Sequence, residues 1–128
     1  SRGEPLRGAR ELLELVPPWL SCHQREPVLL HGDLWCGNAG LLTNGCGTIF
    51  DPASFWGDRE VDLAMAQLFG GFPKAFFSGY KDVWPLEPGA KGRVDLYNLY
   101  HLLNHANLFG GSWGLRAQAS IDQLLGQG

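Results

Sequence analysis

Charged residues and cysteines are scarce in this sequence of 128 residues, of which 18% are charged and three are cysteine. Cys22, Cys36 and Cys46 are odd in number and form no C-x-x-C pair, so neither a disulfide framework nor a zinc site is predicted. The net charge is −3 and the basic residues are scattered, which argues against nucleic-acid binding. No apolar run reaches the ~18 residues of a membrane span, and the N-terminal residues lack a signal-peptide core. We therefore expect reduced thiols, a cytoplasmic location, and neither a nucleic-acid nor a membrane partner.

Hydrophobic residues make up 45% of the chain, which indicates a globular protein. Helical periodicity predicts helices over Leu6–Val16, ended by Pro17-Pro18, and over four later segments: Glu60–Phe69, Pro73 through Tyr80, Arg93–Phe109 and Leu115–Leu125. Asn44-Gly45 between two short apolar runs predicts a β-hairpin. Phe55–Arg59 and Trp84–Gly92 are expected to be loops, and the Phe and Trp residues at 69, 72, 76, 77, 84 and 109 mostly core. The predicted fold class is mainly α with a small β-hairpin (α+β).

Polar residues at fixed spacing follow the two apolar runs that end before His31 and Asp51. His31 and Asp33 follow Val28–Leu30, Asn38 lies five residues after Asp33, and Asp51 ends the second run. A kinase needs a carboxylate that orients the acceptor hydroxyl and takes its proton, and oxygen ligands that hold Mg²⁺ on the phosphates of ATP. Asp33 is therefore predicted to be the base, and Asn38 and Asp51 the metal ligands. The alternative is a strand end that carries two aspartates without a catalytic role.

Three neighbouring residues have weaker indications. We expect His31 to hold the predicted catalytic loop, 31–38, through a hydrogen bond or packing. Asp62 resembles the aspartate that ties down this loop in related kinases; equally, it is a favourable charge at a helix N-terminus, worth about 0.3–1 kcal/mol. Cys36 lies inside the loop, where we favour a small buried hydrophobe over a redox-sensitive thiol. Gly32 replaces the arginine of H-R-D, so we expect no control by a phosphorylated activation loop.

Four sequence blocks resemble the fructosamine-3-kinase (ketosamine-3-kinase) family of the kinase-like, aminoglycoside-phosphotransferase-like superfamily. The blocks are HGDLWCGN, FDPASFWGDREVDLAM, LFGGFPKAFFSGY and LNHANLFG, within residues 29–111. The resemblance implies the C-terminal lobe of a protein-kinase-like fold and ATP-dependent phosphorylation of the 3-hydroxyl of fructosamines, including glycated lysines, as in protein deglycation. It gives Asp33, Asn38 and Asp51 the roles predicted above, and it places Trp35 and His105 in the sugar-binding wall. An indole face can stack on the C–H surface of a sugar. The alternative for His105 is a satisfied histidine on a core helix.

Features of an ATP-binding upper lobe are missing from this sequence. Only Gly3, Gly8 and Gly32 precede Asp33, and all three lysines follow it, so neither a glycine-rich loop nor a strand lysine is available. We expect one kinase-like C-terminal lobe over 1–128, with a catalytic loop (31–38), a metal-binding hairpin end (51–53) and a helical acceptor-binding part (60–128). Little turnover is expected from it alone.

Two other functions stay open from the sequence. The acceptor could be another amino sugar, an aminoglycoside or a choline-like molecule. Choline would require an aromatic cage and aminoglycosides a cluster of carboxylates. Alternatively, the chain is a non-catalytic binding or interaction module that associates through the face left by the missing N-terminal lobe.

Overall fold

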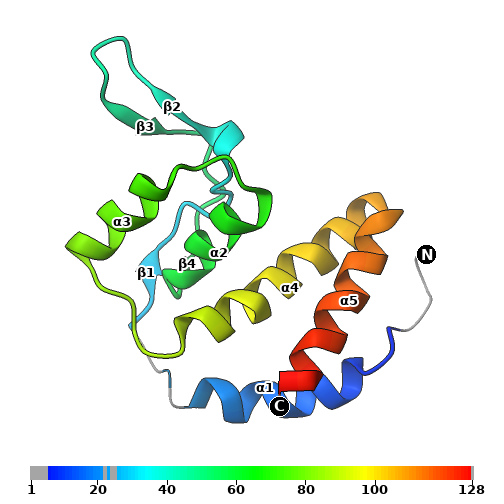
Figure 1. Ribbon diagram of the computed structural model, residues 1–128. Coiled ribbons are helices and arrows are strands. Elements are labelled where there is room, and N and C mark those ends of the chain that lie inside the picture. The colour runs from blue at the N-terminus through cyan, green and yellow to red at the C-terminus, as the bar shows by residue number, and fades with distance from the viewer. Residues whose placement is uncertain (1–5, 22, 24–25, 128) are drawn as a thin grey trace. The chain divides into compact units, whose positions relative to one another are not determined.

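The computed structural model describes residues 6–21, 23 and 26–127, and Figure 1 shows the path of the chain. The chain divides into two compact units. The central unit is Glu26–Val94, and the terminal unit combines Ser1–Arg25 with Asp95–Gly128. Helix α4, Ala90–Phe109, begins in the central unit and continues in the terminal unit. Its start is earlier than the predicted Arg93, so the expected loop over Trp84–Gly92 ends sooner than the sequence indicated.

The central unit contains two antiparallel strand pairs. Strand β1 (Val28–Leu29) pairs with β4 (Trp56–Gly57), and β2 (Ala39–Leu41) pairs with β3 (Gly47–Ile49). The prediction that Phe55–Arg59 is only a loop was wrong, because Trp56 pairs with Leu29 and Gly57 with Val28. A two-residue strand is too short to show an alternating pattern, so only the long-range pairing reveals it.

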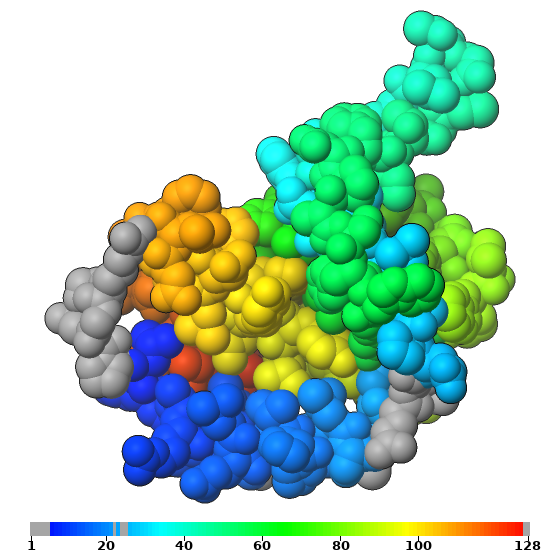
Figure 2. All heavy atoms as spheres, turned by 180° about the vertical axis from the view of Figure 1, so that it is seen from behind, coloured from blue at the N-terminus to red at the C-terminus, as the bar shows by residue number. Residues whose placement is uncertain are grey.

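The predicted hairpin is confirmed as β2 and β3, joined by a turn at Asn44-Gly45. Gly45 adopts a φ of 84°, and the Asn44 side-chain oxygen accepts a hydrogen bond from the Cys46 N–H at 3.0 Å. The tip of the hairpin projects away from α2 (Glu60–Phe69) (Figures 1 and 2). Most of its side chains are exposed, and Leu41 retains 79% of its accessible surface, whereas Ala39 and Thr48 are half-buried.

Helices α2 and α3 (Lys74–Val83) confirm two predicted helices, with Pro73 directly before α3 rather than inside it. The core of the central unit consists of the side chains of Leu30, Leu34, Leu63, Ala64, Met65 and Ala66, all of which are buried. Phe72, Phe76 and Phe77 contact one another around the start of α3. The expectation that the large aromatic residues are mostly core was wrong: Trp84 and Phe109 are exposed, and the other four, Phe69, Phe72, Phe76 and Phe77, are only half-buried.

The terminal unit is built on α1 (Ala9–Ser21) and α5 (Ser112–Gln127), which lie side by side. Leu12 of α1 and Ile121 and Leu124 of α5 are buried. At the exposed edge, the Arg7 N–H donates to the Gln118 side chain at 2.8 Å, and that side chain donates back to the Arg7 carbonyl at 2.9 Å. The predicted helix at Leu115–Leu125 is therefore present and longer than expected at both ends.

The prediction that Pro17-Pro18 ends the first helix was wrong, because α1 contains both prolines and continues to Ser21. A proline cannot donate to the carbonyl four residues earlier, here those of Leu13 and Glu14. Both of these residues are exposed, so water can bind the two carbonyls. None of the helices in the described part of the chain combines the length and apolar character that crossing a bilayer requires.

Candidate functional site

His31 links the predicted catalytic loop to the strand that precedes Asp51. Its Nδ1 accepts the Asp33 backbone N–H at 3.2 Å, and its Nε2 lies 2.7 Å from the Phe50 carbonyl oxygen. Because a backbone N–H only donates and a carbonyl only accepts, these partners assign the neutral imidazole with its proton on Nε2. The ring is buried. His31 therefore holds the backbone of Asp33 to the end of β3.

Asp62, in the first turn of α2, accepts two backbone N–H groups of the same loop. Its carboxylate oxygens bind the His31 N–H at 2.8 Å and the Gly32 N–H at 3.0 Å. Such charge-assisted hydrogen bonds are roughly twice as strong as neutral ones. Asp62 also lies where the positive end of a helix dipole favours a carboxylate, so the two sequence-based interpretations hold together.

Gly32, which stands where H-R-D kinases have arginine, lies against the backbone that follows Asp51. Its φ is 88°, and a Cβ at this position would overlap the carbonyl oxygen of Ala53. The Ala53 N–H also donates to the His31 carbonyl at 2.9 Å. The loop thus packs directly on the backbone of Asp51-Pro52-Ala53, which leaves no room for an arginine side chain. A glycine flanked by histidine and aspartate was the only sequence signal of this contact.

The side chains of Asp33 and Asn38 contact each other. The Asn38 amide nitrogen lies 3.0 Å from the Asp33 carbonyl oxygen and 3.2 Å from Asp33 Oδ2. Two acceptors of this kind require the NH₂ group, so the amide oxygen of Asn38 is the atom without a hydrogen-bond partner among the described residues. Asn38 is 7% exposed, and its backbone carbonyl accepts the Phe50 N–H at 3.0 Å. The predicted base and one predicted metal ligand are therefore adjacent.

Asp51 directly follows Phe50 and has the unusual φ of 56°. Among the described residues it is the one non-glycine residue with a positive φ. Left-handed backbone costs a non-glycine residue of order 1–2 kcal/mol and is concentrated at functional sites. No sequence pattern predicted this positive φ.

The predicted catalytic loop ends in the 3₁₀ helix η1 (Cys36–Asn38), which we call the catalytic turn after that prediction. The Trp35 ring covers this turn. A Cβ on Gly37 would overlap the Trp35 indole, so the ring lies across this glycine, and 41% of Trp35 is exposed. Trp35 thus offers an accessible aromatic surface two residues from Asp33. The expectation that Cys36 is a buried hydrophobe was wrong, because Cys36 is exposed.

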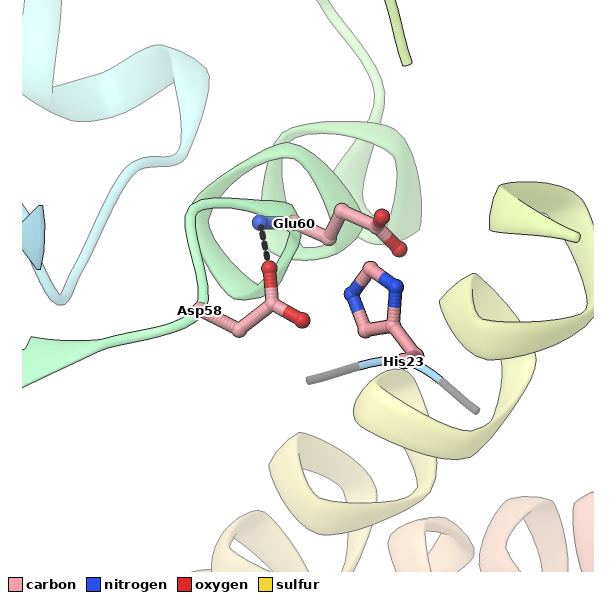
Figure 3. Close-up of side chains that lie close together, drawn as sticks. All are labelled: His23, Asp58 and Glu60. Atoms are coloured by element: carbon pink, nitrogen blue, oxygen red, sulfur yellow. Dashed lines mark hydrogen bonds between the residues drawn. The ribbon is translucent and has the colours of Figure 1, made fainter. Parts of the chain in front are cut away.

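Buried charges anchor the start of α2. Glu60, which is 2% exposed, receives two hydrogen bonds from Arg93: Nε to Oε1 at 2.8 Å and an Nη to Oε2 at 2.9 Å. The Glu60 N–H donates to Asp58 Oδ1 at 3.0 Å (Figure 3). Arg59 stacks on the Trp84 ring at 4.0 Å and donates to the carbonyls of Trp84 and Pro85. These contacts fix the N-terminus of α2, and with it Asp62.

His105 belongs to the terminal unit, whereas Trp35 and the other predicted site residues belong to the central unit. Its Nδ1 lies 2.8 Å from the His101 carbonyl, one helical turn earlier. Its ring contacts those of Trp113, with centroids 4.7 Å apart, and Phe109, at 5.7 Å. His105 is thus part of an aromatic cluster at the end of α4, and its predicted place beside Trp35 stays a prediction.

Comparisons with known proteins match almost the whole chain to one family. The family model "Fructosamine kinase" matches residues 2–127. A Vibrio cholerae protein named "Probable ketoamine kinase" is 50% identical over 124 residues, which are 97% of this chain. A Synechocystis protein, "Probable ketoamine kinase slr1563", is 56% identical over 110 residues, 86% of this chain. A crystal structure from Haemophilus somnus, provisionally named a fructosamine-3-kinase, matches 97% of this chain with a TM-score of 0.84 and 34% identity.

The matched part is less than half of each relative. This chain spans 43% of the Vibrio cholerae protein, 37% of the Synechocystis protein and 43% of the chain in the Haemophilus somnus structure. Together with the mainly helical fold and its small strand pairs, these matches show the C-terminal lobe of a kinase-like fold.

Proposed function

The chain belongs to the fructosamine kinase family, and from this premise we propose that it supplies the catalytic base and metal ligands of an ATP-dependent ketosamine 3-kinase. The observation that carries the proposal is the 3.2 Å contact between the side chains of Asp33 and Asn38. This contact lies beside the strained Asp51 and is held in place by His31 and Asp62. A glycated lysine or a small fructosamine is the proposed acceptor, so the biological role would be protein deglycation, in the cytoplasm.

In the proposed reaction, Asp33 accepts the proton of the acceptor's 3-hydroxyl as its oxygen bonds to the γ-phosphorus of ATP. The bond from that phosphorus to the bridging oxygen breaks, and ADP leaves. The amide oxygen of Asn38 and the carboxylate of Asp51 are hard oxygen donors, which suit Mg²⁺. Mg²⁺, when bound, neutralises charge on the phosphates. Trp35 would stack on the sugar and shield the reacting hydroxyl from water. His105 would form hydrogen bonds to sugar hydroxyls.

The metal assignment is tested with the 128-residue chain itself. Mn²⁺ added to ¹⁵N-labelled protein should broaden the amide signals of Asp33, Asn38 and Asp51. Asp51→Asn should remove this broadening, because it deletes the carboxylate charge while asparagine tolerates the positive φ. Asp82→Asn, an exposed position on α3, is the matched control and should leave the broadening unchanged. Uniform broadening, or none at these three residues, would contradict the assignment.

We also propose that this chain requires the remaining part of the kinase for turnover. The hairpin and the start of α3 enclose an apolar groove of about 710 Å³, lined by Leu41, Ile49, Phe72, Phe76 and smaller residues of the central unit. No charged residue occurs between Asp33 and Asp51, although exposed strand edges usually carry charges that prevent association. An apolar segment from the part of fructosamine kinases that this chain does not match is the proposed occupant.

This proposal predicts binding to the rest of a relative supplied as a separate polypeptide. The non-matching part of the Vibrio cholerae protein should co-elute with the chain during size exclusion and give ATP-dependent phosphorylation of fructosyl-lysine. The chain alone should show negligible turnover, because positioning and charge neutralisation supply most of the rate. Leu41→Asp should abolish co-elution, whereas Leu115→Asp, at a residue on α5 that is 76% exposed, should not. Self-association of the chain would instead identify a second copy as the occupant.

A further inference from the structure

The turn that follows α2 contacts the catalytic turn at Cys36. Gly71 lies in this turn with a φ of 91°, and a Cβ placed on it would be 2.5 Å from Cys36 Sγ and 2.7 Å from Cys36 Cβ. Side-chain carbons in real proteins essentially never approach other atoms this closely. The Cα of Gly71 therefore packs against Cys36, and any side chain at position 71 would push the two segments apart.

The neighbouring Gly70 allows the effect of the Cys36 contact to be distinguished from the effect of backbone strain. Gly70 also has a positive φ, 67°, but a Cβ there would meet nothing within 4 Å. Alanine at either position would carry backbone strain, and at Gly70, where ψ is −168°, it would enter a region that essentially only glycine occupies. Only alanine at position 71 would also collide with Cys36. Gly70→Ala is therefore a stringent control, because it strains the same turn without the collision.

A shift of the Cys36 backbone would reach Asn38 through the hydrogen bonds of the catalytic turn. The Asn38 N–H donates to the Trp35 carbonyl at 2.9 Å, and the Ala39 N–H donates to that of Cys36. The Trp35 ring already covers Gly37. A displacement of Cys36 is therefore transmitted through the three-residue turn to the Asn38 side chain and its contacts with Asp33.

We propose that Gly71 is a positioning residue, which sets the Asn38 amide against Asp33 by allowing the turn after α2 to support Cys36. This proposal rests on the proposed function only in giving Asn38 a role in metal binding. The placement of the amide itself is a separate, measurable quantity. Position 71 is thereby part of the working site although it lies more than thirty residues after Asn38 in the sequence.

The test measures the side-chain NH₂ signals of Asn38 in ¹⁵N-labelled protein, with Mn²⁺ broadening as the second readout. Gly71→Ala should shift both NH₂ signals and weaken Mn²⁺ binding roughly tenfold, as supporting residues of metal ligands typically do. Gly70→Ala should leave the Asn38 signals and the Mn²⁺ affinity as in the unmodified chain. Equal effects of the two substitutions would overturn the proposal, because strain alone would then account for both.

Two further variants separate positioning from a general loss of folding. Cys36→Gly removes both atoms that the new Cβ would meet, so Gly71→Ala combined with Cys36→Gly should match Cys36→Gly alone. Cys36→Val enlarges the same contact from the other side at ordinary backbone angles, and it should shift the Asn38 signals if Gly71→Ala does not fold. Absence of rescue in the double variant, or unshifted signals in Cys36→Val, would contradict the proposal. If Mn²⁺ fails to broaden Asn38 even in the unmodified chain, the metal assignment fails while the NH₂ shifts still decide the role of Gly71.

Discussion

The central and terminal units hold themselves together in different ways. In the central unit, buried or half-buried polar groups of His31, Asn38, Glu60 and Asp62 make specific hydrogen bonds to backbone and charged partners. In the terminal unit, the buried side chains of α1 and α5, such as Leu12, Ile121 and Leu124, are aliphatic, although Asn98 and His101 of α4 are buried as well. Short irregular segments need directional contacts to fix them, whereas long helices need only an apolar face. We therefore expect the phosphoryl transfer to take place in the central unit, where polar contacts fix Asp33 and Asn38.

Breaking the ion pair of the central unit should have the largest effect on stability. Glu60→Gln leaves Arg93 in a buried site with a neutral partner, and such losses typically cost about 3–5 kcal/mol. Urea unfolding should show this decrease in the free energy of unfolding. Glu11→Gln, at an exposed position on α1, is the control and should change stability by less than about 0.5 kcal/mol. Equal stability of the two variants would show that the ion pair does not anchor α2.

Shortening the buried Ile121 side chain tests whether aliphatic packing stabilises the terminal unit without affecting the site in the central unit. Ile121 is 1% exposed, and Ile121→Ala should destabilise the chain by about 2–4 kcal/mol through lost burial and the cavity left behind. Circular dichroism during thermal unfolding measures the loss. Below the unfolding transition, the Asn38 NH₂ signals should remain unchanged. A shift of those signals would mean that the site depends on the packing of α5.

Weakening the hydrogen bonds from the His31 and Gly32 N–H groups to Asp62 should affect only the loop around these two residues. Asp62→Asn places an NH₂ group against one of the two backbone N–H donors of His31 and Gly32, and a lost hydrogen bond to a charged group is worth about 1.5–3 kcal/mol. Hydrogen exchange should therefore quicken by roughly tenfold to a hundredfold at these two amides, since each 1.4 kcal/mol is a factor of about ten. The amides of α5 serve as the internal control. Unchanged exchange at His31 and Gly32 would show that other contacts hold the loop.

The smallest structural effect is expected at His105. His105→Phe keeps an aromatic ring beside Trp113 and Phe109, so stability should change by less than about 1 kcal/mol. If His105 binds sugar hydroxyls as proposed, the KM for fructosyl-lysine should rise in the complex reconstituted with the remaining part of the kinase, at an unchanged KM for ATP. A KM for fructosyl-lysine equal to that of the unmodified chain would leave His105 with only its place in the aromatic cluster.

Local patterns predicted the elements that hold the site. The Asn-Gly turn signalled the hairpin, the three- and four-residue spacing signalled α2, and the separation of Asp33 from Asn38 signalled two groups that contact each other in the structure. Each of these signals lies within about twelve residues. The helix over Pro17-Pro18 was missed because the exposure of the preceding carbonyls depends on the tertiary fold.

Contacts between distant segments were beyond the reach of the sequence. The pairing of β1 with β4, the approach of Gly32 to Ala53 and that of Cys36 to Gly71 each join segments about twenty to thirty-five residues apart. The sequence does not show whether a glycine is needed for a turn or for a close contact with another segment. The positive φ of Asp51 likewise depends on the packing of its neighbours, so no local sequence pattern predicts it.

We propose that Asp33 is the base that activates a ketosamine 3-hydroxyl. The most direct measurement replaces the matching segment of the Vibrio cholerae protein with this chain and compares kcat/KM for fructosyl-lysine with and without Asp33→Asn. Loss of a general base should lower kcat/KM by about 10²–10⁴ while the KM for ATP stays unchanged, with the product phosphorylated at the 3-hydroxyl. An Asp33→Asn chimera that retains full activity, or a parent chimera that phosphorylates an aminoglycoside in preference to fructosyl-lysine, would contradict the account.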